Sequence, residues 1–275
     1  MPGGVAAHLV QLDIAWEHPE ANYEAVRQLL DKVPVNPGDF ILLPEMFATG
    51  FSFNVEKTND KSGATLAFLV ELAADFQAIV QGGRTVAACH QCAAGNVMTV
   101  VSPDGRVLCE YQKIHPFMKE AERFEGGREV MTYRWPPPNS TDTPLNVCPA
   151  ICYDLRFPEL FRIGLQQGAE VFALGACWPN VRQHHWRSLL IARAIENQAY
   201  VLGCNRTGKE PTPSTLVYAG GSIVIGPKGE VLGELDDKPG VLSVPIDAGA
   251  VRAWRVQFPA WRDVRLMAAK PPARA

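Results

Sequence analysis

Apolar and polar positions along the chain predict strands and helices in turn. Val5–Ile14 is a mostly apolar run suited to a buried strand, and Pro19–Val33 repeats its apolar residues at helical spacing. The further segments with a strand or helix pattern are Phe40–Leu43, Ala64–Phe76, Ala78–Val80, Thr85–Ala88, Asn96–Val101, Val107–Tyr111, Glu170–Leu174, His185–Gln198 and Tyr200–Cys204. Because strands and helices alternate, the pattern is typical of an α/β protein.

The second half of the chain ends in a group of short strands. Gly221–Ile225 and Val231–Leu235 flank a G-P-K-G turn and are expected to pair, and Gly240–Ile246 is expected to extend this second sheet. The helix predicted over His185–Gln198 is expected to turn three residues inward, namely Leu189, Ala192 and Ile195. Each half then has strands with helices on one side. Two such halves can stack sheet against sheet, which predicts a four-layer α-β-β-α sandwich.

The domain organisation follows from length and from the absence of a linker pattern. A chain of 275 residues with 47% hydrophobic content can bury a large core in one domain or two. The stretch richest in Pro, Ser and Thr, Trp135–Pro144, spans only about ten residues and is expected to be a surface loop. We therefore expect a single domain over residues 1–275, with a C-terminal arm at about 250–275.

The aromatic character of this arm suggests a partner. Ala250–Leu266 carries Trp254, Phe258 and Trp261, which are costly to leave in water. We expect the arm to dock on a second copy of the chain, which predicts a homodimer.

Charge and hydropathy exclude several classes of partner. The net charge is −3, from 26 basic and 29 acidic residues that are spread evenly, so we expect neither a nucleic-acid interface nor a polybasic membrane patch. The N-terminus lacks the pattern of a secretory signal, and no apolar run approaches the roughly 18 residues that span a bilayer. We expect a cytoplasmic protein that acts on small molecules.

The seven cysteines do not form a metal-binding pattern. The only C-x-x-C, Cys89–Cys92, has neither a second close pair nor an H-x-x-x-H partner, so we expect no zinc and no other metal. Apart from Cys152, the thiols are interpreted as structural or incidental.

Cys152 lies at the centre of the stretch Pro149–Arg162. The apolar run that ends at Ile151 predicts a strand, and Pro158 opens a helical pattern, so the thiol is expected at a sharp strand-to-helix bend like a nucleophile elbow. The positive end of the following helix would favour the thiolate. A lone cysteine at a strand end is more often part of the core, so a catalytic interpretation needs a base and an oxyanion stabiliser nearby.

Two further reactive side chains end predicted strands. Glu45 follows Phe40–Leu43, and Lys113 follows Val107–Tyr111. The carboxyl ends of strands in α/β sheets are where side chains from different strands converge. Together the three groups suffice for acyl transfer through a thioester, because Glu45 can take the proton of Cys152 and Lys113 can stabilise the developing oxyanion.

Three motifs around these residues resemble a known family. L-L-P-E-M-F at Leu42–Phe47, Y-Q-K-I-H-P-F at Tyr111–Phe117 and I-C-Y-D-L-R-F-P-E at Ile151–Glu159 are similar to the signature segments of the nitrilase superfamily, the carbon–nitrogen hydrolases. The resemblance implies the four-layer sandwich, a Glu–Lys–Cys triad and no metal or organic cofactor.

The resemblance also implies supporting residues at the site. A second glutamate is expected shortly after Lys113, with Glu120 favoured and Glu122 as the alternative. The N–H of Tyr153 is expected to join Lys113 in the oxyanion hole. Arg156 and Glu159 are interpreted as an internal ion pair that holds the bend.

The finer resemblance concerns the substrate. P-E-M-F-A-T-G-F at Pro44–Phe51 and W-P-N-V-R-Q-H-H-W at Trp178–Trp186 resemble bacterial ω-amidases, which implies hydrolysis of the terminal amide of a 2-oxo acid such as 2-oxoglutaramate. Arg182 is the candidate partner of the substrate carboxylate. A carbamoyl amino acid hydrolase or a nitrilase would use the same triad. An alternative of another class is a catalytically silent interaction module.

Overall fold

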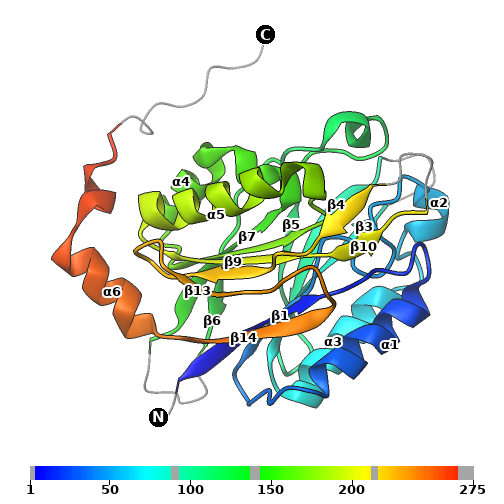
Figure 1. Cartoon of the computed structure of the whole chain (residues 1–275), viewed down its shortest axis with the longest axis horizontal. Coiled ribbons are helices and arrows are strands. Elements are labelled where there is room, and N and C mark those ends of the chain that lie inside the picture. The colour runs from blue at the N-terminus through cyan, green and yellow to red at the C-terminus, as the bar shows by residue number, and fades with distance from the viewer. Residues whose placement is uncertain (1–3, 88–92, 137–142, 212–215, 266–275) are drawn as a thin grey trace.

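Two six-stranded sheets stack face to face and form the centre of the molecule, as the computed structural model shows (Figure 1). The structure describes residues 4–87, 93–136, 143–211 and 216–265. Cys89–Cys92, the middle of Trp135–Pro144 and the last ten residues of the arm therefore lie outside the described residues.

The first sheet has the order β14-β1-β2-β3-β4-β5. Its strands are β1 Val5–Gln11, β2 Phe40–Leu42, β3 Ile79–Val86, β4 Gly95–Val101, β5 Val107–Gln112 and β14 Gly240–Ile246. β1, β2 and β3 run parallel, β4 is antiparallel to β3, and β5 is antiparallel to β4, so β5 again runs in the direction of β2. Glu45 lies three residues after the carboxyl end of β2, and Lys113 directly follows the carboxyl end of β5.

The second sheet has the order β13-β12-β9-β8-β7-β6. Its strands are β6 Tyr133–Trp135, β7 Leu145–Ile151, β8 Val171–Ala176, β9 Tyr200–Asn205, β12 Ile223–Ile225 and β13 Val231–Glu234. A separate two-stranded ribbon is formed by β10 Thr207–Lys209 and β11 Val217–Ala219. Both large sheets contribute apolar side chains to one core cluster, with Leu9 and Phe40 from the first and Leu174 and Leu202 from the second.

Helices cover the outer faces of both sheets (Figure 1). α1 Pro19–Leu30 and α3 Ala64–Phe76 lie on the first sheet, and α4 Pro158–Gln166 and α5 Gln183–Asn197 lie on the second. The remaining helical segments are α2 Val55–Thr58, α6 Ala248–Gln257 and the 3₁₀ turns Met118–Glu122, Cys152–Arg156, Asn180–Arg182 and Ala260–Asp263. This is the α-β-β-α sandwich that the sequence predicted. None of the described helices is both long and apolar enough to cross a bilayer.

Two local predictions are wrong. β14 pairs with β1 along its whole length, from Val5↔Ile246 to Gln11↔Gly240, so it extends the first sheet and not the second. In α5, Ile195 is 53% exposed, while Leu190 and the polar Arg193 are buried. Arg193 occupies the inner face because its guanidinium donates to the Leu155 carbonyl at 2.8 Å, a contact that an apolar periodicity does not reveal.

The first part of the C-terminal arm contacts its own chain. Val251 is fully buried, and Arg252 forms an ion pair with Glu170 at 2.7 Å. Arg255 donates to the Ala169 carbonyl at 2.6 Å. The homodimer, and a crossing of the arm to a partner, stay predictions.

Candidate active site

Glu45 lies in a tight passage between the two sheets. It follows β2, and its side chain has no exposed surface. A Cβ atom on Gly83 would come within 2.5 Å of the Met46 nitrogen, and one on Gly175 within 2.7 Å of the Leu43 carbonyl oxygen. Because both positions lack a side chain, β3 and β8 can approach the loop and enclose the carboxylate.

Lys113 is joined to Glu45 and Glu120. Its Nζ donates to Glu45 Oε1 and to Glu120 Oε2, each at 2.8 Å, and lies 5.2 Å from the centroid of the Phe51 ring. Burial by itself would lower the pKa of Lys113, but the two carboxylates raise it above its ordinary value. Lys113 is therefore a permanent cation at neutral pH.

The two candidate second glutamates have opposite environments. Glu120 is fully buried, and its Oε2 also accepts from the Phe117 N–H at 2.6 Å, whereas Glu122 is exposed. Burial raises the pKa of Glu120, Lys113 opposes this shift, and the charge of Glu45 adds to it. The structure thus brings Glu120, and not Glu122, to Glu45 and Lys113.

Cys152 sits at the end of β7 with φ of 45°, a left-handed conformation that is strained for a residue with a side chain. Asp154 holds this bend: it accepts from the Ile151 N–H at 3.0 Å, the Tyr111 hydroxyl at 2.7 Å and the His115 N–H at 3.1 Å. These bonds tie the bend to the end of β5, next to Lys113.

The expected stabilisation of the thiolate is not found. Burial raises the pKa of Cys152 well above its usual value, the charge of Glu45 raises it further, and Lys113 only partly opposes them. α4 begins only at Pro158, so its N-terminus is not at the sulfur. The resting group is a neutral thiol beside a carboxylate.

A second thiol belongs to the same environment. The Cys177 N–H donates to Glu45 Oε2 at 2.9 Å, and its Sγ lies 3.2 Å from the Glu45 carbonyl oxygen. Burial and the Glu45 charge raise the pKa of this thiol as well. Cys177 therefore orients Glu45 through its backbone.

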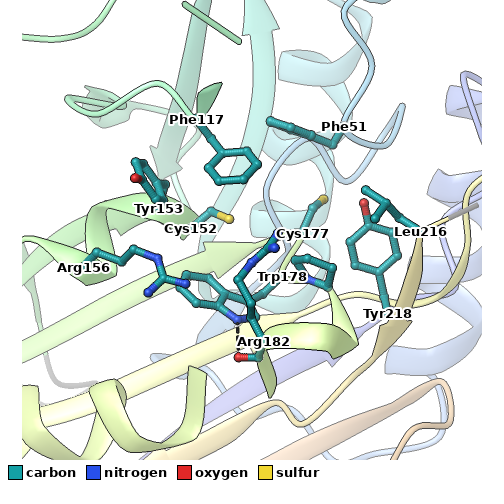
Figure 2. A pocket seen from close by; sticks show the side chains of 11 residues that line it. Phe51, Phe117, Cys152, Tyr153, Arg156, Cys177, Trp178, Arg182, Leu216 and Tyr218 are labelled. Atoms are coloured by element: carbon teal, nitrogen blue, oxygen red, sulfur yellow. Dashed lines mark hydrogen bonds between the residues drawn. The ribbon is translucent and has the colours of Figure 1, made fainter. Parts of the chain in front are cut away.

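A narrow pocket opens onto Cys152, with a cavity volume of about 40 Å³ (Figure 2). Its wall is largely aromatic and includes Phe51, Phe117, Tyr153, Trp178 and Tyr218. The Tyr153 ring meets Phe117 edge to face, with centroids 4.9 Å apart. The pocket thus presents an apolar surface around a thiol.

Two arginines line the same pocket. Arg182 lies 5.4 Å from the Phe117 ring centroid, and its carbonyl accepts from the Trp178 indole at 2.8 Å. The predicted ion pair between Arg156 and Glu159 is wrong, because Arg156 instead lies 4.8 Å from the Trp178 ring and contacts His185 at 3.3 Å. Within the described residues neither guanidinium is paired with a carboxylate.

Sequence reasoning missed two residues that hold this site together. Asn96 on β4 donates to both glutamates, and Asp154 anchors the bend. Asp154 stands inside the I-C-Y-D motif, so its position next to Cys152 was a usable signal. No sequence signal marked Asn96, because a single polar residue at the start of a strand is common in proteins without any functional role.

Comparisons with known proteins identify the family of the chain. Residues 6–256 match the carbon-nitrogen hydrolase family. The chain is 32% identical to the 2-oxoglutaramate amidase of Bacillus subtilis over 93% of this chain and 96% of that protein. It is 33% identical to the omega-amidase YafV of Yersinia enterocolitica, over 93% and 94% of the two chains. The crystal structure of XC1258 from Xanthomonas campestris, a CN-hydrolase superfamily protein, superimposes with a TM-score of 0.87 at 30% identity, covering 97% of this chain and 99% of that one.

Proposed function

Because the chain belongs to the carbon–nitrogen hydrolase family and is an amide-hydrolysing enzyme, we propose that it hydrolyses the terminal amide of a short 2-oxo acid, with 2-oxoglutaramate as the preferred substrate. The observation that carries the proposal is the buried pair of Glu45 and Lys113 beside Cys152, whose thiol lines a pocket that also holds two arginines not paired with any described carboxylate. The relatives named for ω-amide hydrolysis support the choice of substrate.

The first half of the proposed reaction forms a thioester. Glu45 accepts the proton of the Cys152 thiol as the sulfur attacks the amide carbon. Lys113 Nζ and the Tyr153 N–H stabilise the negative oxygen of the tetrahedral intermediate. Glu45 then returns the proton to the leaving nitrogen, so ammonia departs and the acyl group stays on Cys152.

The second half releases the acid. Water attacks the thioester carbon and gives a proton to Glu45, and the same oxyanion donors act again. The carbon–sulfur bond breaks, the thiolate takes the proton back, and the carboxylic acid leaves. Glu120 does not touch the substrate in this scheme and holds Lys113 in place.

The two arginines of the pocket are assigned to bind the carboxylate end of the substrate. With the amide carbon at Cys152, a terminal carboxylate needs a cationic partner at the other end of the pocket, and Arg182 and Arg156 are the two cations of its lining. Glutamine is expected to be poorer, because its ammonium group would approach a site that already holds Lys113 and these arginines.

A substrate comparison tests the proposal. We would measure kcat/KM for 2-oxoglutaramate, glutamine, a carbamoyl amino acid and a simple nitrile under one set of conditions. 2-Oxoglutaramate should be the best of the four. A tenfold preference for the carbamoyl compound or the nitrile would refute the ω-amidase assignment and leave the triad chemistry intact. A silent interaction module would release no ammonia from any of them.

The proposal extends to assembly and location. The exposed Ile195 and Phe258, each 53% exposed, are apolar surface that a second copy would cover in a homodimer. The described cysteines are free thiols, as is usual in the reducing cytoplasm.

A further inference from the structure

Asn96 contacts three charged residues of the site, Glu45, Glu120 and Lys113. It lies at the start of β4 and its side chain is buried. Its Nδ2 donates to Glu45 Oε1 at 2.7 Å and to Glu120 Oε1 at 2.9 Å. Its carbonyl oxygen accepts from the Lys113 N–H at 2.9 Å. One residue therefore links the two glutamates and the lysine, although it does not line the pocket.

The buried cluster around Asn96 holds more negative than positive charge. Two carboxylates, Glu45 and Glu120, share one cation, Lys113, and all three side chains are at most 1% exposed. Like charges in a poorly solvated site favour protonation of one of the pair. Additional N–H donors oppose this, because they stabilise the anionic form of a carboxylate.

The orientation of the Asn96 amide agrees with this need. Its Oδ1 is buried without a hydrogen-bond partner among the described residues. A flipped amide would place that oxygen against two carboxylates, so the nitrogen must face them. A buried oxygen without a partner is unfavourable, so the favourable polar contacts of this side chain are the two that its Nδ2 donates.

We propose that Asn96 is a positioning residue that holds Glu45 and Glu120 together as anions beside Lys113, so that Glu45 is ready to accept the proton of Cys152. The proposal rests on the proposed function for the role of Glu45. The other titratable groups around the pair come from separate elements, namely Cys152 after β7, Cys177 after β8 and Glu210 after β10. None of these supplies a hydrogen bond that joins the two glutamates.

Asn96→Asp tests the proposal with almost no change of shape. The substitution replaces the shared donor with a third carboxylate, so proton uptake by the cluster becomes easier and less Glu45 is available as a base. Asn197→Asp is the matched control. Asn197 is also buried, its Nδ2 donates to the Arg193 carbonyl at 3.0 Å, and its Oδ1 also lacks a partner, but it lies at the end of α5.

Two readouts are needed. The first is kcat and KM for 2-oxoglutaramate from pH 5 to 9. In Asn96→Asp we expect kcat at neutral pH to fall about 10²-fold or more, as for loss of a general base, with KM changed by less than about threefold. The apparent pKa on the acidic side of the kcat–pH profile should increase by about one pH unit.

The second readout needs no substrate. The rate at which iodoacetamide alkylates Cys152, followed by mass spectrometry of its peptide, reports proton loss from the thiol. In Asn96→Asp this rate should be lower at each pH, with its midpoint displaced upward. If the wild-type protein hydrolyses no amide, the proposed function fails, while the alkylation comparison still decides the role of Asn96.

Several outcomes would overturn the proposal. One is an Asn96→Asp protein with kcat within about threefold of wild type and an unchanged pH dependence of alkylation. Another is an equal loss in Asn197→Asp, which would show only the cost of burying a charge. If Asn96→Asp does not fold, Asn96→Ser decides: its hydroxyl can donate to one carboxylate only, so kcat should fall and alkylation should slow, and wild-type behaviour would refute the role.

Discussion

Replacing Lys113 by methionine should destabilise the protein and abolish most activity. The substitution keeps a long side chain but removes the ammonium that donates to Glu45 and Glu120, each at 2.8 Å. Breaking a buried ion pair by removing one partner typically costs about 3–5 kcal/mol, because the other charge stays buried. For a chain of this size, a loss of about 3–5 kcal/mol corresponds to a decrease in Tm of about 6–20 °C.

The loss of stability should depend on pH, and its sign follows from the charges. Burial and the charge of Glu45 already raise the pKa of Glu120, and Lys113 opposes this rise. Without the lysine the folded-state pKa of Glu120 rises further above the unfolded value. A carboxyl whose pKa is raised on folding binds more protons in the folded state, so stability falls as pH rises from the unfolded pKa towards the folded one. The stability of Lys113→Met should therefore be closer to that of the wild type at pH 5 than at pH 8.

Thermal unfolding followed by circular dichroism at these two pH values measures the effect. The matched control is Lys57→Met, because Lys57 pairs with Glu17 at 3.1 Å but is 59% exposed, so its loss should cost about 1 kcal/mol or less. Activity of Lys113→Met should fall at least about 10²–10³-fold, as for loss of an oxyanion donor. A variant that unfolds at the wild-type temperature would contradict this account of the buried cluster. So would a variant whose Tm is lowered by the same amount at both pH values.

Three shorter predictions concern the nucleophile, the pocket and the assembly. Cys152→Ala should fold normally and lose turnover, and trapping of an acyl adduct on any other cysteine would show that the nucleophile is misassigned. Arg182→Ala should raise KM for 2-oxoglutaramate about 10-fold or more, and have little effect on a neutral amide; equal losses for both substrates would remove the arginine from carboxylate binding. Light scattering at micromolar concentration should give the mass of a dimer, and a monomer would refute the assembly, while an unchanged mass after truncation at Pro245 would exclude the arm from the interface.

The sequence by itself identified the layers and the ends of the strands. Strand and helix periods are local properties, so apolar runs such as those in β1 and β8 predict buried strands without knowledge of their neighbours. The placement of Glu45, Lys113 and Cys152 at strand ends is equally local. Their meeting at one point follows once the two sheets are stacked, because carboxyl ends of parallel strands share an edge.

Tertiary structure decided which residues complete the site. Glu120 and Glu122 are two positions apart in one short segment, and only the 3₁₀ turn at Met118–Glu122 determines which carboxylate faces Lys113. The same holds for Arg156, which turns towards Trp178 and away from Glu159. The pattern of apolar residues also could not predict that β14 pairs with β1, because burial of a strand does not specify its neighbour.

The ionisation of Cys152 shows most clearly which properties depend on local sequence and which depend on tertiary structure. Its place at a strand-to-helix bend is readable from a few neighbouring residues, and the bend itself is formed. The pKa of the thiol depends instead on burial and on the distance to Glu45, more than a hundred positions away in the chain, and these raise it where the local helix was expected to lower it. Local geometry is encoded by adjacent residues, whereas electrostatic environment is a sum over all groups that folding brings near.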